Sequence, residues 1–196
     1  MYAYFKGIIA DVEEDALIID VNNIGYRIYC PDDMLKSHVK GETLTVYTYT
    51  CVREDAFILY GFGQKEDLKL FKLLITVSGI GPKMALGILS VMDSSSVIGA
   101  IISGNSKLLS SAPGIGAKTA GRIILELKDK VNPADMINSL SNIEKDDEVI
   151  ALRNEAFEAL VGLGISSLEA SKAINRVEIN KDSKIENIIK QLLSII

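Results

Sequence analysis

The first sixty residues alternate short apolar runs with polar turns, which is the pattern of a small β-structure. Five runs are rich in Val, Ile, Thr, Tyr and Phe, and turn-forming residues such as Asp, Glu, Asn, Pro and Gly bound them. The predicted strands are residues 5–12, 16–21, 24–30, 43–52 and 56–62. Residues 31–41 read as a longer polar connection. This arrangement favours a small closed barrel of the OB type, with a plain antiparallel sandwich as the alternative.

From Gly63 onward the apolar positions follow helical spacing. Leu68, Phe71 and Ile75 recur at intervals of three and four residues, and the pattern resumes over residues 84–89. A glycine-rich segment separates the two stretches. The sequence therefore predicts a mainly helical region that begins where the strands end.

The glycine-rich segment is repeated. Residues 77–85 align on residues 112–120 with an offset of 35 residues, and Gly, Ile, Gly, Lys and Ala coincide. In each copy two glycines separated by isoleucine precede a helix whose first turn carries a lysine, Lys83 or Lys118. The unpaired N–H groups of a helix N-terminus, together with a lysine, favour an anion. We expect phosphates of a nucleic-acid backbone, bound without reading sequence; a glycine turn that only joins packed helices is the alternative.

Other sites are excluded by the residues that are missing. A dinucleotide-binding loop would need a third glycine at Met84 or Thr119, and no P-loop is present, so the chain should not hydrolyse ATP itself. Cys30 and Cys51 lack the paired spacing of a zinc site, and we expect no disulfide between them. The only histidine, His38, lies in a polar turn and is expected to be solvated.

The last third of the chain predicts a linker and a small bundle. Residues 135–148 are rich in Asn, Ser, Asp and Glu and are typical of a flexible acidic linker. Three short helices are expected beyond it, over residues 151–163, 167–175 and 183–196, with Ser167 and Ser183 as N-caps. A bundle of this size is marginal but feasible.

Charge is unevenly distributed along the chain. The net charge of −5 alone argues against a nucleic-acid partner. Residues 64–134, however, carry nine basic and five acidic side chains and are the only basic segment. Because phosphate neutralisation is local, this segment is where a polyanion would dock. Neither a membrane-spanning run nor a signal-peptide pattern is present in the sequence, so we expect a cytoplasmic protein.

The order of these parts resembles the RuvA family, the bacterial Holliday-junction-binding subunits of a branch-migration machine. The resemblance covers essentially the whole chain. It rests on Arg53-Glu54-Asp55-Ala56 and Leu59-Tyr60-Gly61-Phe62 at the end of the barrel, on hairpins over residues 78–83 and 113–118, on Lys128-Asp129-Lys130, and on the detached helical bundle.

The resemblance implies an α+β multidomain protein. It places a five-stranded OB-type barrel with tetramerisation contacts in residues 1–63, tandem helix-hairpin-helix motifs in 64–134, a linker in 135–148 and a UBA-like three-helix bundle in 149–196. It implies a non-catalytic subunit without cofactor or metal that binds four-way DNA junctions as a homotetramer, with one tetramer or two facing tetramers on the junction. The implied partners are the hexameric ATPase RuvB and the RuvC resolvase, in recombination, DNA repair and the SOS response.

The resemblance also assigns residues to three surfaces. The groups that would grip DNA phosphates are Ser78, Gly79, Gly81, Lys83, Gly114, Gly116, Lys118, Thr119 and Arg122. An acidic pin of Glu54 and Asp55 would repel phosphates at the centre of the junction. The apolar surface that would bind RuvB comprises Leu160, Leu163, Ile165, Leu168, Ala170 and Ile174.

Two rival functions belong to other classes. A helix-hairpin-helix glycosylase or nuclease would need a catalytic lysine or aspartate after its hairpin. Asp129 follows the second hairpin, but it is flanked by lysines on what reads as a helix surface. A general single-strand binder would need exposed aromatic residues on the barrel strands. Four tyrosines could serve, namely Tyr26, Tyr29, Tyr47 and Tyr49.

Overall fold

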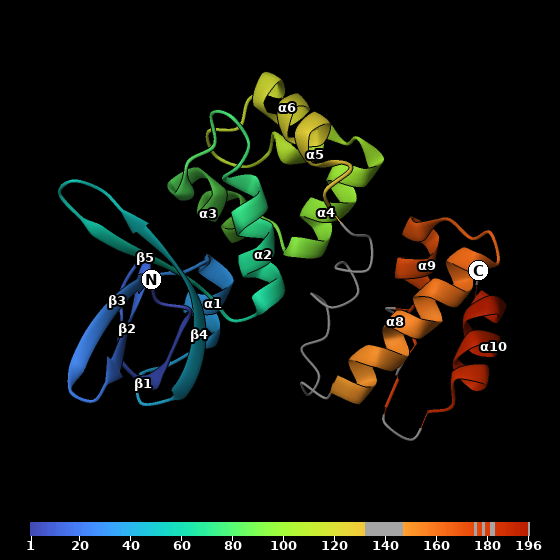
Figure 1. Ribbon diagram of the computed structural model, residues 1–196, viewed down its shortest axis with the longest axis horizontal. Helices are drawn as coiled ribbons and strands as arrows, with labels where there is room; N and C mark the ends of the chain where they lie inside the picture. The colour runs from blue at the N-terminus through green and yellow to red at the C-terminus, as the bar shows by residue number, and fades with distance from the viewer. Residues whose placement is uncertain (132–146, 175, 178, 181–182, 196) are drawn as a thin grey trace. The chain divides into compact units, whose positions relative to one another are not determined.

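A computed structural model shows two compact units, Met1–Lys130 and Val131–Ile196 (Figure 1). The structure describes residues 1–131 and 147–196, except 175, 178, 181–182 and 196. The expected linker lies mostly outside the described residues. Its last two positions, 147 and 148, begin a helix.

The first unit opens with a closed five-stranded barrel, which confirms the predicted architecture and excludes the sandwich. Its strands follow the order β1-β2-β3-β5-β4, and β4 pairs with β1 to close it. The strands are β1 (Tyr4–Val12), β2 (Ala16–Val21), β3 (Ile24–Tyr29), β4 (Thr43–Val52) and β5 (Phe57–Phe62). Alternate residues of these strands fill one apolar core, including Phe5, Ile9, Leu17, Ile28 and Val46.

The connection after β3 is not purely polar, because it contains the short helix α1 (Asp32–Ser37). Met34 and Leu35 of this helix are buried in the barrel core. A single helical turn shows no periodicity, so the sequence did not reveal it. The prediction for His38 is also wrong: this residue is half-buried, and its Nδ1 lies 2.9 Å from the Met34 carbonyl oxygen, at the C-terminal end of α1.

Helices form the rest of the first unit. They are α2 (Lys65–Leu74), α3 (Pro82–Val91), α4 (Ser94–Ser103), α5 (Ser106–Leu109) and α6 (Ala117–Leu127). The sequence did not single out α4, which links the two repeats. Its start is well defined, since the Asp93 carboxylate accepts hydrogen bonds from the N–H and hydroxyl of Ser96 and from the hydroxyl of Ser95.

Removal of the α4 cap gives the first testable prediction. Burial raises the pKa of Asp93, but the hydrogen bonds from Ser95 and Ser96 outweigh burial, so its pKa is lowered in the folded protein. The stabilisation is therefore present above the unfolded pKa of about 4 and is lost as the pH falls through the folded pKa. We expect Asp93→Ala to cost about 1 kcal/mol near pH 7. Urea unfolding of the full chain should show this difference shrinking at acidic pH; a constant difference would contradict the prediction.

The described part of the second unit contains three helices, as expected. They are α8 (Asp147–Gly162), α9 (Ser167–Ile174) and α10 (Ile185–Ile195), and their buried core includes Phe157, Leu160, Ile174 and Leu192. Gly164 has φ +90° and ends α8 in a Schellman arrangement, with the N–H of Ile165 donating to the Leu160 carbonyl.

The predicted N-caps of this unit are each displaced. Ser166, not Ser167, caps α9: its hydroxyl accepts from the N–H of Glu169 and donates to the Glu169 carboxylate. Ser183 lies two residues before α10, and its hydroxyl bonds Asn180 instead of the helix. A capping residue one position away reads equally well in sequence, and only the backbone distinguishes the two.

Among the described residues, no single helix has both the length and the apolar composition to cross a membrane. The pair α3 and α4 reaches that threshold only when the two are taken together, across a bend of 99°.

Candidate nucleic-acid interface

The first glycine repeat is the hairpin of a helix-hairpin-helix unit and joins α2 to α3. Ile80 is buried and its N–H donates to the Val77 carbonyl (3.0 Å), which anchors the turn in the core. Gly79 has φ +90°, a backbone conformation that would be strained in a residue with a side chain. Gly81 is the N-cap of α3, has no side-chain cap and leaves open space where a Cβ would lie. The turn therefore presents bare backbone and the first N–H groups of α3 to solvent.

The second repeat, between α5 and α6, reproduces this geometry. Ile115 is buried and donates to the Ala112 carbonyl (3.1 Å), Gly114 has φ +79°, and Gly116 is the N-cap of α6. The two N-caps have nearly the same dihedral angles, φ −92° and ψ 171° at Gly81 against φ −83° and ψ 168° at Gly116. One difference is chemical: Pro82 opens α3 without an N–H, whereas Ala117 opens α6 with one. The second hairpin thus offers one more donor.

Each hairpin contacts the other, because the helix of one lies near the turn of the other. A guanidinium N–H of Arg122, on α6, donates to the Ser78 carbonyl of the first turn (2.9 Å). In return, the place of a Cβ on Gly114 is 3.8 Å from the end of the Met84 side chain, on α3. Arg122 also faces Glu126 at 3.9 Å. The bond to Ser78 ties the first turn to the second helix and uses one of the five N–H donors of Arg122, whose side chain is exposed.

Lys83 and Lys118 complete the two hairpins. Each occupies the first turn of its helix, and both residues are exposed. Within the described residues neither lysine has an ion-pair partner. Thr119 follows on α6 and is half-buried. Both hairpins thus combine unpaired N–H groups, a helix dipole and a free ammonium group, the features that favour an anion.

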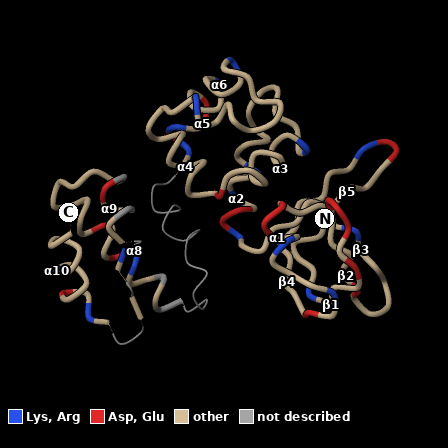
Figure 2. Tube along the Cα trace, turned by 180° about the vertical axis from the view of Figure 1, so that it is seen from behind, with Lys and Arg blue, Asp and Glu red and all other residues tan. Residues whose placement is uncertain are grey.

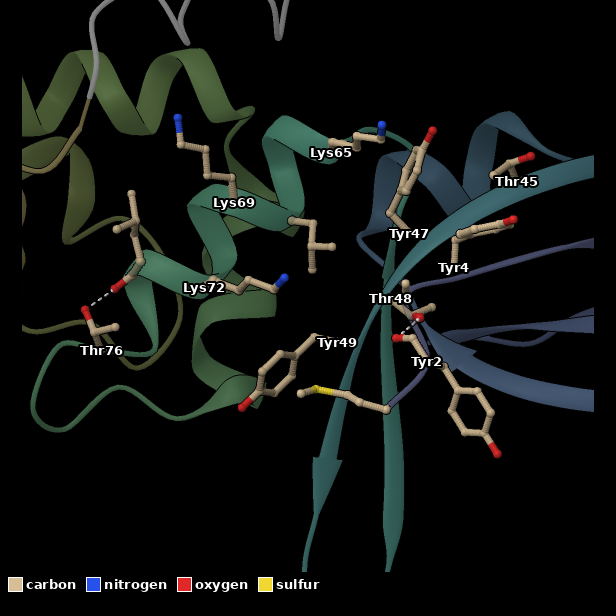
Figure 3. Close-up of a pocket in the computed structure, with 14 residues that line it drawn as sticks. Tyr2, Tyr4, Thr45, Tyr47, Thr48, Tyr49, Lys65, Lys69, Lys72 and Thr76 are labelled. Carbon is tan, nitrogen blue, oxygen red and sulfur yellow. Dashed lines mark hydrogen bonds between the residues drawn. The ribbon is translucent and has the colours of Figure 1, made fainter.

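A hollow of about 980 Å³ lies between the barrel and α2 (Figure 3). Lys65, Lys69 and Lys72 of α2 line one side of it. The other side holds tyrosines from the N-terminus, β1 and β4. The Lys65 ammonium lies 5.6 Å from the centre of the Tyr47 ring.

The four tyrosines considered for single-strand binding are half-buried and contact other groups. Tyr26 packs on Phe5 (4.4 Å between ring centres), Tyr29 lies 6.1 Å from Tyr60, and Tyr49 contacts Phe71 at 5.5 Å. Tyr47 faces Lys65. The rings of Tyr26 and Tyr29 therefore serve packing, whereas Tyr47 and Tyr49 also line the hollow beside α2.

The acidic residues Glu54 and Asp55 lie at the tip of the hairpin between β4 and β5. Arg53 and Ala56 close this turn through a hydrogen bond from the Arg53 N–H to the Ala56 carbonyl (2.9 Å). Both carboxylates are exposed. Figure 2 shows that the hairpin projects from the barrel with its charged residues at the tip.

The groups that a glycosylase or nuclease could use are the acid after the second hairpin, a metal-binding cluster and the cysteine thiols. Asp129 is exposed, beyond the C-terminal end of α6. The described part of the chain holds no cluster of three His, Cys, Asp or Glu side chains that could bind a metal ion. Both cysteines are free, and burial raises the pKa of the Cys30 thiol to about 12, so it stays protonated at neutral pH.

The predicted partner surface of the second unit needs correction. Leu160, Ala170 and Ile174 are fully buried and fill the bundle core, so they cannot meet a partner while the bundle is folded. Ile165 is half-buried and packs on that core, whereas Leu163 is 63% exposed. Leu168 belongs to α9, but its side chain is outside the described residues. Sequence reasoning missed the exposed apolar residues Leu193 and Ile195. Helical periodicity alone does not separate a core position from its neighbour.

Comparisons with known proteins agree with this architecture over the full chain. Three family models match: the RuvA N-terminal domain over residues 1–61, the SAM-like helix-hairpin-helix tandem over 71–129 and the RuvA C-terminal domain over 151–196. The chain is 42% identical over 195 residues to the Holliday junction branch migration complex subunit RuvA of Clostridium beijerinckii, with 98% of each chain covered. The protein of that name from Caldanaerobacter subterraneus is 46% identical over 194 residues, covering 98% of this chain and 97% of the relative.

Proposed function

Because this chain belongs to the RuvA family, we propose that it binds four-way DNA junctions through their phosphate backbone, holds them open and square, and serves as the DNA-binding subunit of a branch-migration complex. Binding would depend on junction shape, since the two hairpins offer no groups to base edges. The hairpin-containing glycosylase or nuclease is not favoured by the full-length relatives.

The observation that carries this proposal is the pair of matched hairpins. Each combines a bare glycine turn, an uncapped helix N-terminus and an exposed lysine. Arg122 bonds the first turn from the second helix, so the two anion sites keep a fixed separation. Two phosphate sites at fixed separation suit the regular spacing of a DNA backbone, and both lie in the one basic segment of the sequence.

The assembly follows from the shape of the ligand. A four-way junction has four equivalent arms, so four copies related by four-fold symmetry would each hold one arm. We propose that the exposed carboxylates of Glu54 and Asp55 meet near the crossover, where they repel phosphates and penalise continuous duplex. The phosphate-binding residues, the acidic pin, the RuvB-binding surface and the domain limits given in the sequence analysis belong to this proposal. The buried residues Leu160, Ala170 and Ile174 are left out of the RuvB-binding surface.

The chain would act without chemistry of its own. We propose that the second unit recruits RuvB, whose ATPase activity would drive migration in the cytoplasm, and that the bound junction is shared with the RuvC resolvase. Exposed apolar residues of that unit, Leu163 among them, support a docking role. The separation of the chain into two compact units is consistent with a tethered recruiting domain.

A competition gel shift tests the central proposal. The purified chain is offered a synthetic four-way junction against linear duplex of the same sequences, at two salt concentrations. We expect a preference for the junction of orders of magnitude, without cleavage and without ATP. Equal binding to both DNAs, or strand scission, would overturn the proposal.

The acidic turn yields a second prediction for the same assay. Glu54→Gln combined with Asp55→Asn removes two charges per copy but keeps the size of both side chains. We expect junction binding to be kept or tightened, and discrimination against linear duplex to fall, because the repulsion that disfavours continuous duplex is gone. Lost junction binding would show that the carboxylates do not act by repulsion.

A further inference from the structure

An exposed apolar pair lies at the base of the acidic turn. Val52 ends β4, Phe57 begins β5, and the two are direct cross-strand partners. Phe57 is 78% exposed and Val52 is 63% exposed. Directly opposed residues lie on the same face of a ladder, so the two side chains form one apolar surface beside the carboxylates of Glu54 and Asp55.

The topology explains why this surface is uncovered. Strand β1 pairs with β4 only as far as Tyr47, and β3 pairs with β5 only at Leu59 and Tyr60. The chain before β1 follows β4 a little further, because the Ala3 carbonyl accepts from the Thr48 N–H and the Tyr2 N–H donates to the Thr50 hydroxyl. Beyond Thr50 and Leu59 the β4–β5 hairpin is a two-stranded ribbon that runs past the barrel (Figure 1). Alternation places Val52 and Phe57 on the face of the buried residues Thr50 and Leu59. The strand face that points into the barrel core thus continues past the end of the barrel. There it still carries apolar residues, but no other part of the barrel covers them.

The surroundings decide what can cover Phe57. Its ring packs against no other aromatic ring in the described part of the chain. Two side chains are far fewer than the roughly 20 residues a side of a stable protein interface. The neighbouring carboxylates repel phosphate, but they do not repel the flat, uncharged face of a base. An aromatic side chain stacks on any base without reading its edges.

We propose that Phe57 stacks on a nucleobase exposed where the strands part at the junction crossover. The inference rests on the proposed function, which brings the acidic turn to that crossover. The turn then has two parts with different tasks: Glu54 and Asp55 exclude the phosphates, and Phe57 receives a base that has lost its stacking neighbour. Stacking stabilises the open form of the junction in every sequence context.

Tryptophan fluorescence gives a direct test, because the chain contains no tryptophan. In Phe57→Trp the single indole reports only this position. We expect a four-way junction to quench its emission, with a midpoint that matches the gel shift, and linear duplex to leave it unchanged. Val39→Trp is the matched control. Val39 is also mostly exposed (61%), but it lies before the start of β4, whereas Phe57 is paired with Val52 at the end of that strand. The emission of this variant should not respond to either DNA.

A binding series separates stacking from mere apolarity. Phe57→Tyr keeps the ring and should keep the preference for the junction over duplex. Phe57→Leu keeps an apolar side chain and should lose about tenfold of that preference. Both variants should fold, because the position is mostly exposed.

The possible outcomes are distinguishable. A wild-type chain without junction preference removes the proposed function itself. A kept preference with unquenched indole, or a leucine variant equal to the tyrosine variant, removes only the stacking role. Indole emission that changes with protein concentration in the absence of DNA would show that another copy covers Phe57, and would also overturn the stacking proposal.

Discussion

Replacing Lys83 and Lys118 together with alanine should weaken junction binding more than about a hundredfold at physiological salt. The two ammonium groups are the free charges of the matched hairpins, and counterion release makes each phosphate contact contribute roughly one unit to the slope of log K against log salt. Four copies that each lose two contacts would therefore flatten that slope by roughly seven units. Gel shifts of the full chain over a range of salt concentrations measure both quantities.

A matched control removes the same number of charges elsewhere. Lys6 and Lys40 are exposed and lie in the barrel unit outside the basic segment. The variant Lys6→Ala with Lys40→Ala changes the net charge equally, and we expect its salt slope to stay close to that of the wild type. If the two double variants lose affinity alike, the hairpins contribute only general charge and the phosphate sites are not where we place them.

The substitution Leu163→Asp should abolish RuvB-driven branch migration and leave junction binding unchanged. Leu163 is an exposed apolar residue just beyond α8, and a carboxylate there would be buried unpaired in any apolar contact with a partner. Truncation of one of the few residues that anchor an interface costs about 2 kcal/mol or more, about thirtyfold in affinity, and a charge adds to that loss. Junction binding is followed by gel shift and migration by strand separation with added RuvB.

Two further variants distinguish a lost docking contact from an unfolded bundle. Leu160→Ala should unfold the bundle, since Leu160 is fully buried and a cavity there costs about 2–5 kcal/mol. It would lose migration for a structural reason, visible as lost helical signal. Val39→Asp places a charge on an exposed apolar residue of the first unit and should migrate normally. Normal migration by Leu163→Asp would rule out this residue as a docking contact.

Local patterns predicted the elements well because they depend on short-range physics. Strand alternation located all five strands to within a residue or two, and Gly79 and Gly114 marked both hairpins because they occupy conformations that only glycine adopts easily. The switch to helical spacing at Gly63 marked the end of the barrel. By contrast, the single turn of α1 and the capping residue of α9 were missed, because neighbouring positions carry the same local preference.

Exposure depended on where the elements pack. Leu160 and Leu163 look alike in the sequence, yet one fills the bundle core and the other faces solvent. Phe57 continues the apolar face of a strand, and nothing in its neighbourhood along the chain shows that the barrel ends before it. Arg122 reads as one more cation, and its bond to the Ser78 carbonyl joins residues 44 positions apart.

The sequence by itself determined the five strands, the repeated hairpins, the basic segment and the helical bundle, since each is a periodic or repeated pattern of residue types. Only the tertiary structure decided that the barrel closes, that Arg122 fixes one hairpin against the other, and that Phe57 and Leu163 are uncovered. These properties are set by contacts between segments distant in the chain, and burial is a property of the packed whole that no local pattern contains.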